Sequence, residues 1–126
     1  MNLSPAARLG RAELLAVVEV LPRGSSSQFL QAQTSGFRAL LCARRGETEE
    51  AERRFKRATG LFRELALVFY LGVALLEYGE SLVGQNRSGE AEPLLAEARA
   101  TFERLGAIPW LDRAGEAASS GRKHER

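Results

Sequence analysis

Residues 51–65, AERRFKRATGLFREL, have a related counterpart further along the chain at 91–105, AEPLLAEARATFERL. Five positions carry the same residue in both copies, and Phe55 of the first copy is matched by the apolar Leu95 of the second. The identical pairs are Ala51 with Ala91, Glu52 with Glu92, Ala58 with Ala98, Phe62 with Phe102, and Leu65 with Leu105. Self-similarity at a fixed period is typical of proteins built from a repeated unit. These two stretches therefore decide the fold class.

Each copy places small and large apolar residues on one face of a helix. Two antiparallel helices approach closely only where their facing side chains are small, and one large apolar residue per turn fills the remaining space. A single helical hairpin cannot bury its apolar face alone, so hairpins stack. The sequence predicts an all-α fold of stacked antiparallel hairpins whose core includes the apolar face of each copy. These faces are Ala51, Phe55, Ala58 and Phe62 in the first copy, and Ala91, Leu95, Ala98 and Phe102 in the second.

Turn and capping residues divide the chain into about six helices. Ser4-Pro5 is a typical helix start, and Pro22 with Gly24 is expected to end that helix before a loop at Ser25–Ser27. Gly46 is expected to follow the second helix in a left-handed conformation, and Asn86-Arg87 to form a turn. Thr48 and Ser88 are expected to act as helix caps. The expected helices cover residues 5–21, 28–45, 49–65, 67–85, 89–105 and 109–118.

One domain is expected to span residues 1–118. Its repeats cover about 32–65 and 72–105, flanked by the helices 5–21 and 109–118. Trp110 is a further expected core residue and belongs to the last of these helices, which can close the stack. The polar and basic stretch 119–126 is expected to be a disordered tail.

The second copy resembles a tetratricopeptide repeat. The first copy matches the same pattern in its second helix but carries Ser35 and Arg38 where the family has large apolar residues, and its period is longer than the usual one of about 34 residues. The resemblance implies a short right-handed superhelix with Tyr78 and Gly79 in its core. The matching pattern is Leu75, Tyr78-Gly79, Leu82, Ala91, Leu95 and Ala98.

Residues 80–113 are similar to the C-terminal repeats of bacterial multidomain regulators. Such regulators join a nucleotide cyclase domain or a LuxR-type DNA-binding domain to a signalling ATPase and a helical array. The resemblance implies a non-catalytic interaction or regulatory module, a fragment or relative of a larger signal-transduction or transcription regulator. Its partner would be another protein or other domains of that regulator.

The composition sets further expectations. The net charge of +2 provides no strong field that would recruit nucleic acid or a membrane. The single cysteine, Cys42, excludes an internal disulfide framework and favours a reducing, cytoplasmic environment. The longest apolar stretch, residues 65–76, is too short to cross a bilayer.

No group of residues predicts catalysis, a metal site or a cofactor. His124 is the only histidine and lies in the expected tail, so Cys42 has no base to activate it and is expected to be a core residue. Glu49-Glu50 and the pair Glu90 and Glu92 lie at helix starts, where carboxylates complement the helix dipole. We expect a protein that is not an enzyme.

The basic run from Arg53 to Arg57 invites a nucleic-acid interpretation, but neighbouring acids explain it better. Glu49 with Arg53, Glu50 with Arg54, and Glu52 with Lys56 are spaced for ion pairs along a helix. These pairs would neutralise most of the run. The sequence therefore argues against nucleic-acid binding by this module.

The resemblance implies that partners bind in a groove formed by the first helix of each hairpin. Its positions include apolar residues, which suit a partner helix, although the same residues could simply pack against neighbouring helices. The alternative function is a small-ligand sensor that binds an effector in the concave groove. The groove positions are Gln33, Gly36, Leu40, Ala43 and Arg44 in the first repeat, and Val73, Leu76, Glu80, Val83 and Gly84 in the second.

A homodimer is a further expectation. The helix at 5–21 is apolar on more than one face, with Leu9, Leu14, Leu15 and Val18 among its residues, and it has no hairpin partner of its own. A dimer through this helix, with Leu40 and Leu76, would cover it. The alternative is that the helix folds back over the one that follows.

Overall fold

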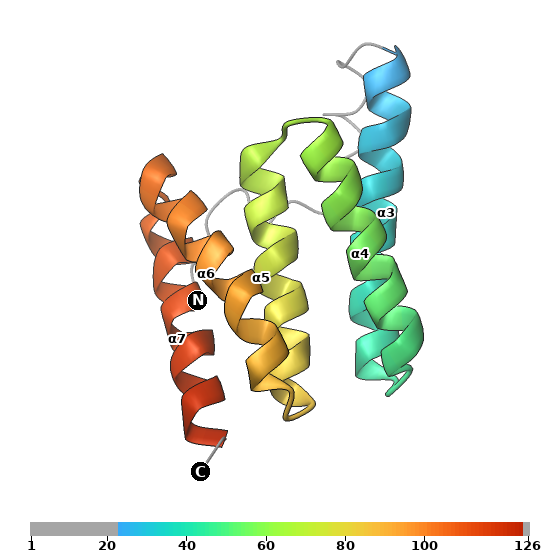
Figure 1. Cartoon of the computed structure of the whole chain (residues 1–126). Coiled ribbons are helices and arrows are strands. Elements are labelled where there is room, and N and C mark those ends of the chain that lie inside the picture. Colours follow the sequence, from blue (N-terminus) through green and yellow to red (C-terminus); the bar gives the residue numbers. More distant parts are fainter. Residues whose placement is uncertain (1–22, 125–126) are drawn as a thin grey trace.

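The computed structural model describes residues 23–124, and this part of the chain is helical throughout apart from short turns (Figure 1). The five described helices are α3 (Arg23–Arg44), α4 (Thr48–Glu64), α5 (Val68–Gly84), α6 (Ser88–Leu105) and α7 (Ile108–His124). The prediction of an all-helical protein is confirmed for these residues. The expected helix at 5–21 lies outside them, so the described helices number five rather than six.

Two boundary predictions are wrong. Gly24 and the serines 25–27 belong to α3 rather than to a loop. The first turn of a helix tolerates such residues because its N–H groups lack intrahelical partners anyway, and the buried ring of Phe29 anchors this end of α3. The predicted tail is also helical as far as His124. Gly121 explains this extension, because its bare backbone fits closely against Ser88 and Val83.

The turns between helices recur at a regular spacing along the chain. Gly46, Ala66, Asn86 and Gly106 all have positive φ angles, between 56° and 78°. In each turn the residue after the one with positive φ donates its N–H back to a carbonyl of the preceding helix, as Glu47 does to Cys42 at 2.9 Å. This bond, with a second from the left-handed residue itself, defines the Schellman motif that ends many helices. Each hairpin, and each link between hairpins, therefore uses the same tight turn.

The predicted capping roles of Thr48 and Ser88 are wrong. The N-cap residues are Glu47 and Arg87, which make no side-chain capping bond, and Thr48 and Ser88 are the first helical residues. The tight turn explains the shift, because the residue after the left-handed one also accepts the first backbone bond of the next helix. The Ala51 N–H, for example, bonds to the Glu47 carbonyl at 3.0 Å.

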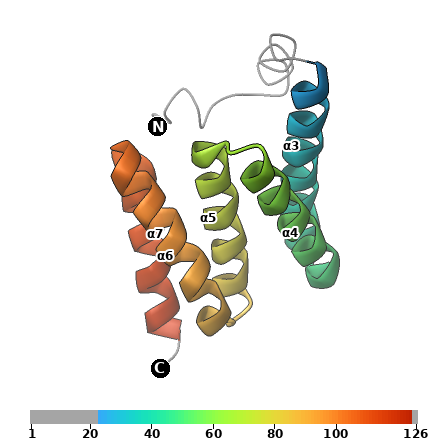
Figure 2. The same cartoon turned by 45° about the horizontal axis from the view of Figure 1, so that its top comes forward.

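The helices form two layers. α3 and α4 make one hairpin, α5 and α6 a second, and α7 covers the far side of the second (Figures 1 and 2). α5 has backbone contacts with both α3 and α7, which places these three helices in one layer. In the other layer α4 and α6 have no such backbone contact, and an ion pair of Arg63 with Glu97 at 2.9 Å joins them. We call the layer of α3, α5 and α7 the inner layer.

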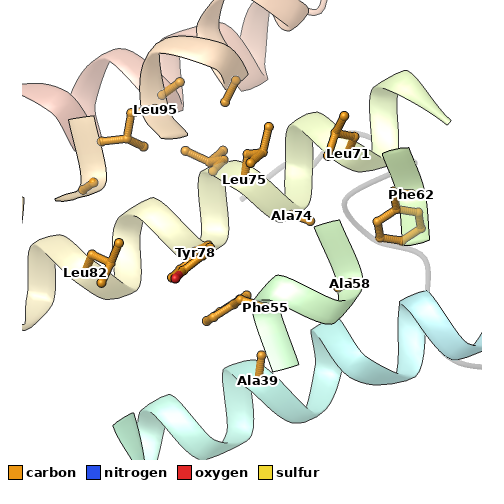
Figure 3. Packing of buried hydrophobic residues seen from close by; sticks show 14 of the residues in the cluster. Ala39, Phe55, Ala58, Phe62, Leu71, Ala74, Leu75, Tyr78, Leu82 and Leu95 are labelled. Carbon is orange, nitrogen blue, oxygen red and sulfur yellow. The ribbon is translucent and has the colours of Figure 1, made fainter. Parts of the chain in front are cut away.

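The structure buries all eleven residues that the sequence placed in the core. Figure 3 shows part of this cluster, where Phe55 of α4 lies against Tyr78 of α5 with ring centroids 5.1 Å apart. α5 and α6 are in close contact at Gly79, where an added Cβ would lie 2.6 Å from a methyl carbon of Leu95. The eleven residues are Ala51, Phe55, Ala58, Phe62, Tyr78, Gly79, Ala91, Leu95, Ala98, Phe102 and Trp110.

Aromatic rings join each hairpin to the helix that follows. Phe29 and Phe62 lie 6.2 Å apart at 64°, and Tyr70 of α5 packs against both rings. The same cluster recurs one period later. Phe69 and Phe102 lie 6.2 Å apart at 63°, and Trp110 of α7 packs against both. The period of the sequence thus has a counterpart in the geometry of the core.

Candidate partner-binding face

The candidate site is the inner layer, which α3, α5 and α7 form. Eight of the ten predicted groove positions are at least partly exposed, among them Gln33, Leu40 and Val73, which are half-buried, and Arg44, which is exposed. Leu76 and Val83 are buried in the core, which corrects their assignment to the groove and that of Leu76 to a dimer interface. Leu76 belongs to the core cluster, and α7 packs against α5, a contact that the two hairpins alone do not predict.

Glu80 is half-buried and already has a partner. Its carboxylate accepts two hydrogen bonds from the Arg113 guanidinium of α7, at 2.9 Å and 2.6 Å. The Arg113 guanidinium also lies 5.4 Å from the ring centre of Trp110. Bidentate pairing and stacking on a ring fix an arginine more firmly than a single ion pair does. This cluster ties α7 to α5 at the edge of the inner layer.

Arg113 is a residue of this face that the sequence prediction missed. The repeat offered a signal, because Arg113 stands one period after Val73, which was predicted to line the groove. To assign Arg113 to this face, the sequence prediction would have had to treat residues 109–118 as the first helix of a third repeat and not as a lone helix. The neighbouring Glu77 was missed as well. Burial raises the pKa of its carboxyl to about 7, against a smaller opposing effect of Arg113.

The opposite layer carries the basic run, and most of its charges are paired with carboxylates. Glu50 pairs with Arg54 at 2.8 Å and also with Arg53, while Glu52 pairs with Lys56 at 3.4 Å. Arg53 thus pairs with Glu50 and not with Glu49 as predicted. The hydrogen bond that Arg53 donates lowers the pKa of the Glu50 carboxyl. The guanidinium of Arg57 donates to Gln31 of α3. The run is mostly engaged within the chain.

No protein-family model, no curated protein and no solved structure matches this chain. Its function is therefore inferred from its own residues.

Cys42 is half-buried, and burial together with a hydrogen bond to Glu47 raises the pKa of its thiol, which disfavours the nucleophilic thiolate. Among the described residues no group of three or more histidine, cysteine, aspartate or glutamate side chains is placed to hold a metal ion. None of the described helices combines the length and apolar character that a membrane crossing requires.

A cleft of about 180 Å³ lies mainly between α6 and α7 rather than on the inner layer. Pockets for drug-sized ligands usually measure roughly 300–1,000 Å³. The cleft is therefore small for the effector that the alternative function requires. Its lining is Val83, Ser88, Glu92, Leu95, Ala96, Arg99, Ala118 and Gly121.

Proposed function

We propose that this chain is a tetratricopeptide-like repeat module that binds a protein partner on the inner face of α3, α5 and α7. The observation that carries the proposal is the recurrence of the aromatic cluster. Phe29, Phe62 and Tyr70 have counterparts one period later in Phe69, Phe102 and Trp110, with matching ring separations. Stacked hairpins of this kind curve and expose an extended concave surface, which repeat proteins use for binding.

The chemistry of the inner face favours a helical or extended segment of a protein as its ligand. Leu40 and Val73 offer apolar contacts on neighbouring helices, and Gln33 and Arg44 offer polar groups near them. An apolar strip with a polar margin is the surface on which an amphipathic helix lays its apolar face. The paired charges of Glu80 and Arg113 limit that strip on the α7 side.

The partner that we propose is another domain of a bacterial signalling regulator, or a protein that such a regulator binds. The support is the likeness of residues 80–113 to the helical repeats of these regulators. In this proposal the module contributes recognition, and it carries out no reaction and needs no cofactor.

A selected peptide tests the proposal without a known partner. Peptides are selected from a displayed random library against the full chain, and their affinity is measured by calorimetry. Leu40→Glu and Val73→Glu should weaken binding at least about tenfold, because a charge would enter an apolar contact. Ala100→Glu, on the exposed side of α6, is the matched control and should leave affinity unchanged. A failure to select peptides, or equal binding by all variants, would contradict the proposal.

A further inference from the structure

One side of α3 carries apolar residues that the described helices leave exposed. Leu30 and Leu41 expose 40% and 38% of their surface, which is high for leucine in a helix that packs on others. About three helical turns separate them, so they stand on the same side of α3. The buried residues of α3, among them Ala32 and Ala39, lie on its other side.

The repeat identifies what this side of α3 corresponds to. Leu30 stands one period before Tyr70, and Arg38 stands one period before Tyr78. On α5 these two tyrosines pack against α4, with Tyr70 5.7 Å from Phe62 and Tyr78 5.1 Å from Phe55. The exposed side of α3 is therefore equivalent to the side of α5 that receives the preceding helix. Within residues 23–124 no helix precedes α3 to occupy it.

The chain itself supplies a segment of suitable length and position. α4 reaches α5 through a tight turn and runs back along it, and the segment 1–22 is attached at the corresponding end of α3. A helix over residues 5–21 would measure about 25 Å, whereas Leu30 and Leu41 are separated by about 17 Å along α3. A tethered segment acts at an effective concentration in the millimolar range, which favours it over a second copy of the chain.

We propose that residues 5–21 pack antiparallel along the side of α3 that carries Leu30 and Leu41, in the place that α4 takes beside α5. In the α4–α5 pair, Phe62 and Tyr70 lie equally far from the turn residue Ala66. If residues opposite each other are again equally far from the turn in sequence, a turn immediately before Arg23 places residues 12–15 opposite Leu30. This stretch includes Leu14 and Leu15, whose side chains match the apolar surface. The inference rests on the repeat arrangement proposed above, but not on the partner of the inner face.

Disulfide trapping in the full-length chain tests this packing. In a Cys42→Ala background, Leu30→Cys is combined in turn with a cysteine at Ala12, Glu13, Leu14 and Leu15, a scan that covers one helical turn. At least one pair should form a disulfide within a single chain, since bridging requires the two Cβ atoms to approach within about 4.5 Å. Mass spectrometry of peptides from the monomer band identifies the bond. The control places the partner cysteine at Gly60, which is exposed on α4, and should yield no such bond.

Two outcomes of the trapping experiment would overturn the proposal. Disulfides that join two chains, with a yield that rises with concentration, would assign the face to a second copy. Yields no higher than with the Gly60 control would show that residues 5–21 lie elsewhere. Hydrogen exchange of the unmodified chain is independent of any variant's folding. Amides of residues 5–21 should exchange at least about tenfold more slowly than in an unstructured peptide, and unprotected amides would also refute the packing.

Discussion

The ring of Phe62 lies 5.7 Å from the ring of Tyr70 at an angle of 21°, and this contact joins the first hairpin to the second. Phe102 and Trp110 repeat it one period later, at 5.8 Å and 30°. Because the two contacts hold equivalent junctions, their loss should have equivalent effects. Phe62→Ala and Phe102→Ala should each lower the free energy of unfolding by about 3–5 kcal/mol, as measured by urea denaturation.

The control for these two variants is Leu105→Ala. Leu105 is identical to Leu65 in the sequence repeat, but half of its surface is exposed. Its truncation should change the free energy of unfolding by no more than about 0.5 kcal/mol. If one of the two phenylalanine variants lost as little free energy of unfolding as Leu105→Ala, the two junctions would not be equivalent.

Gly79 should not tolerate alanine, although alanine is the better helix former. An added Cβ would lie 2.6 Å and 2.8 Å from two carbons of Leu95, in the middle of the contact between α5 and α6. We expect Gly79→Ala to destabilise the protein by about 1–3 kcal/mol, from overpacking. Gly60→Ala is the matched control, because an added Cβ there has open space and the second copy carries Ala100 at this position. It should stabilise the protein by up to about 1 kcal/mol in thermal or urea unfolding.

Ala66 holds a backbone conformation that favours glycine. Its φ angle is 56°, in a turn where the first hairpin meets the second. The left-handed region costs an alanine roughly 1–2 kcal/mol, which glycine avoids. Part of this gain is lost because glycine has a greater conformational entropy in the unfolded state. Ala66→Gly should therefore stabilise the protein by about 0.5–1 kcal/mol. Ala100→Gly, in the middle of α6, should instead cost about 1 kcal/mol. Destabilisation by Ala66→Gly would contradict the turn.

Stability should fall as pH rises towards neutrality, because of Glu77. Burial raises its pKa to about 7 in the folded protein, above an ordinary value of 4.5, with Arg113 and Glu80 as the nearby charges. Because the pKa of Glu77 is higher in the folded than in the unfolded protein, its contribution to the free energy of unfolding is fully present below about pH 4.5. This contribution is lost as pH rises to about 7 and beyond. The loss amounts to at most about 3 kcal/mol. Urea denaturation from pH 5 to 8 measures it.

Glu77→Gln should remove this pH dependence, because the amide does not ionise. Glu92→Gln, at an exposed position of α6, should retain the wild-type profile. If the stability of Glu77→Gln ran parallel to that of the wild type between pH 5 and 8, Glu77 would not be the responsible group.

The sequence predicted those features that local chemistry or the repeat determines. Gly46 has the expected positive φ, and the turn at Asn86-Arg87 was expected, because glycine and asparagine adopt this conformation at little cost. Ala66 gave no such signal, since alanine is a helix former whose left-handed conformation is imposed by the packing of the two hairpins. The α7 extension was missed for a similar reason, because Gly121 is stabilised by a tertiary contact.

The candidate face was harder to predict than the core. Small residues such as Ala58 and Ala98 mark close helix contacts wherever they recur, so their burial follows from the pattern. The pairing of Glu80 depended instead on where α7 packs, which the two recognised repeats do not specify. The correspondence of Val73 with Arg113 held part of that information, and extending the repeat into α7 would have revealed it.

The most direct test of the central claim is the mapping of a bound peptide by NMR. The full chain, labelled with ¹⁵N, is titrated with a peptide selected against it, and amide shifts are followed residue by residue. The account predicts the largest changes on the inner layer, at Leu40, Val73 and their neighbours on α3 and α5, with little change at Gly60 or Ala100. Changes concentrated on the outer sides of α4 and α6 would contradict it.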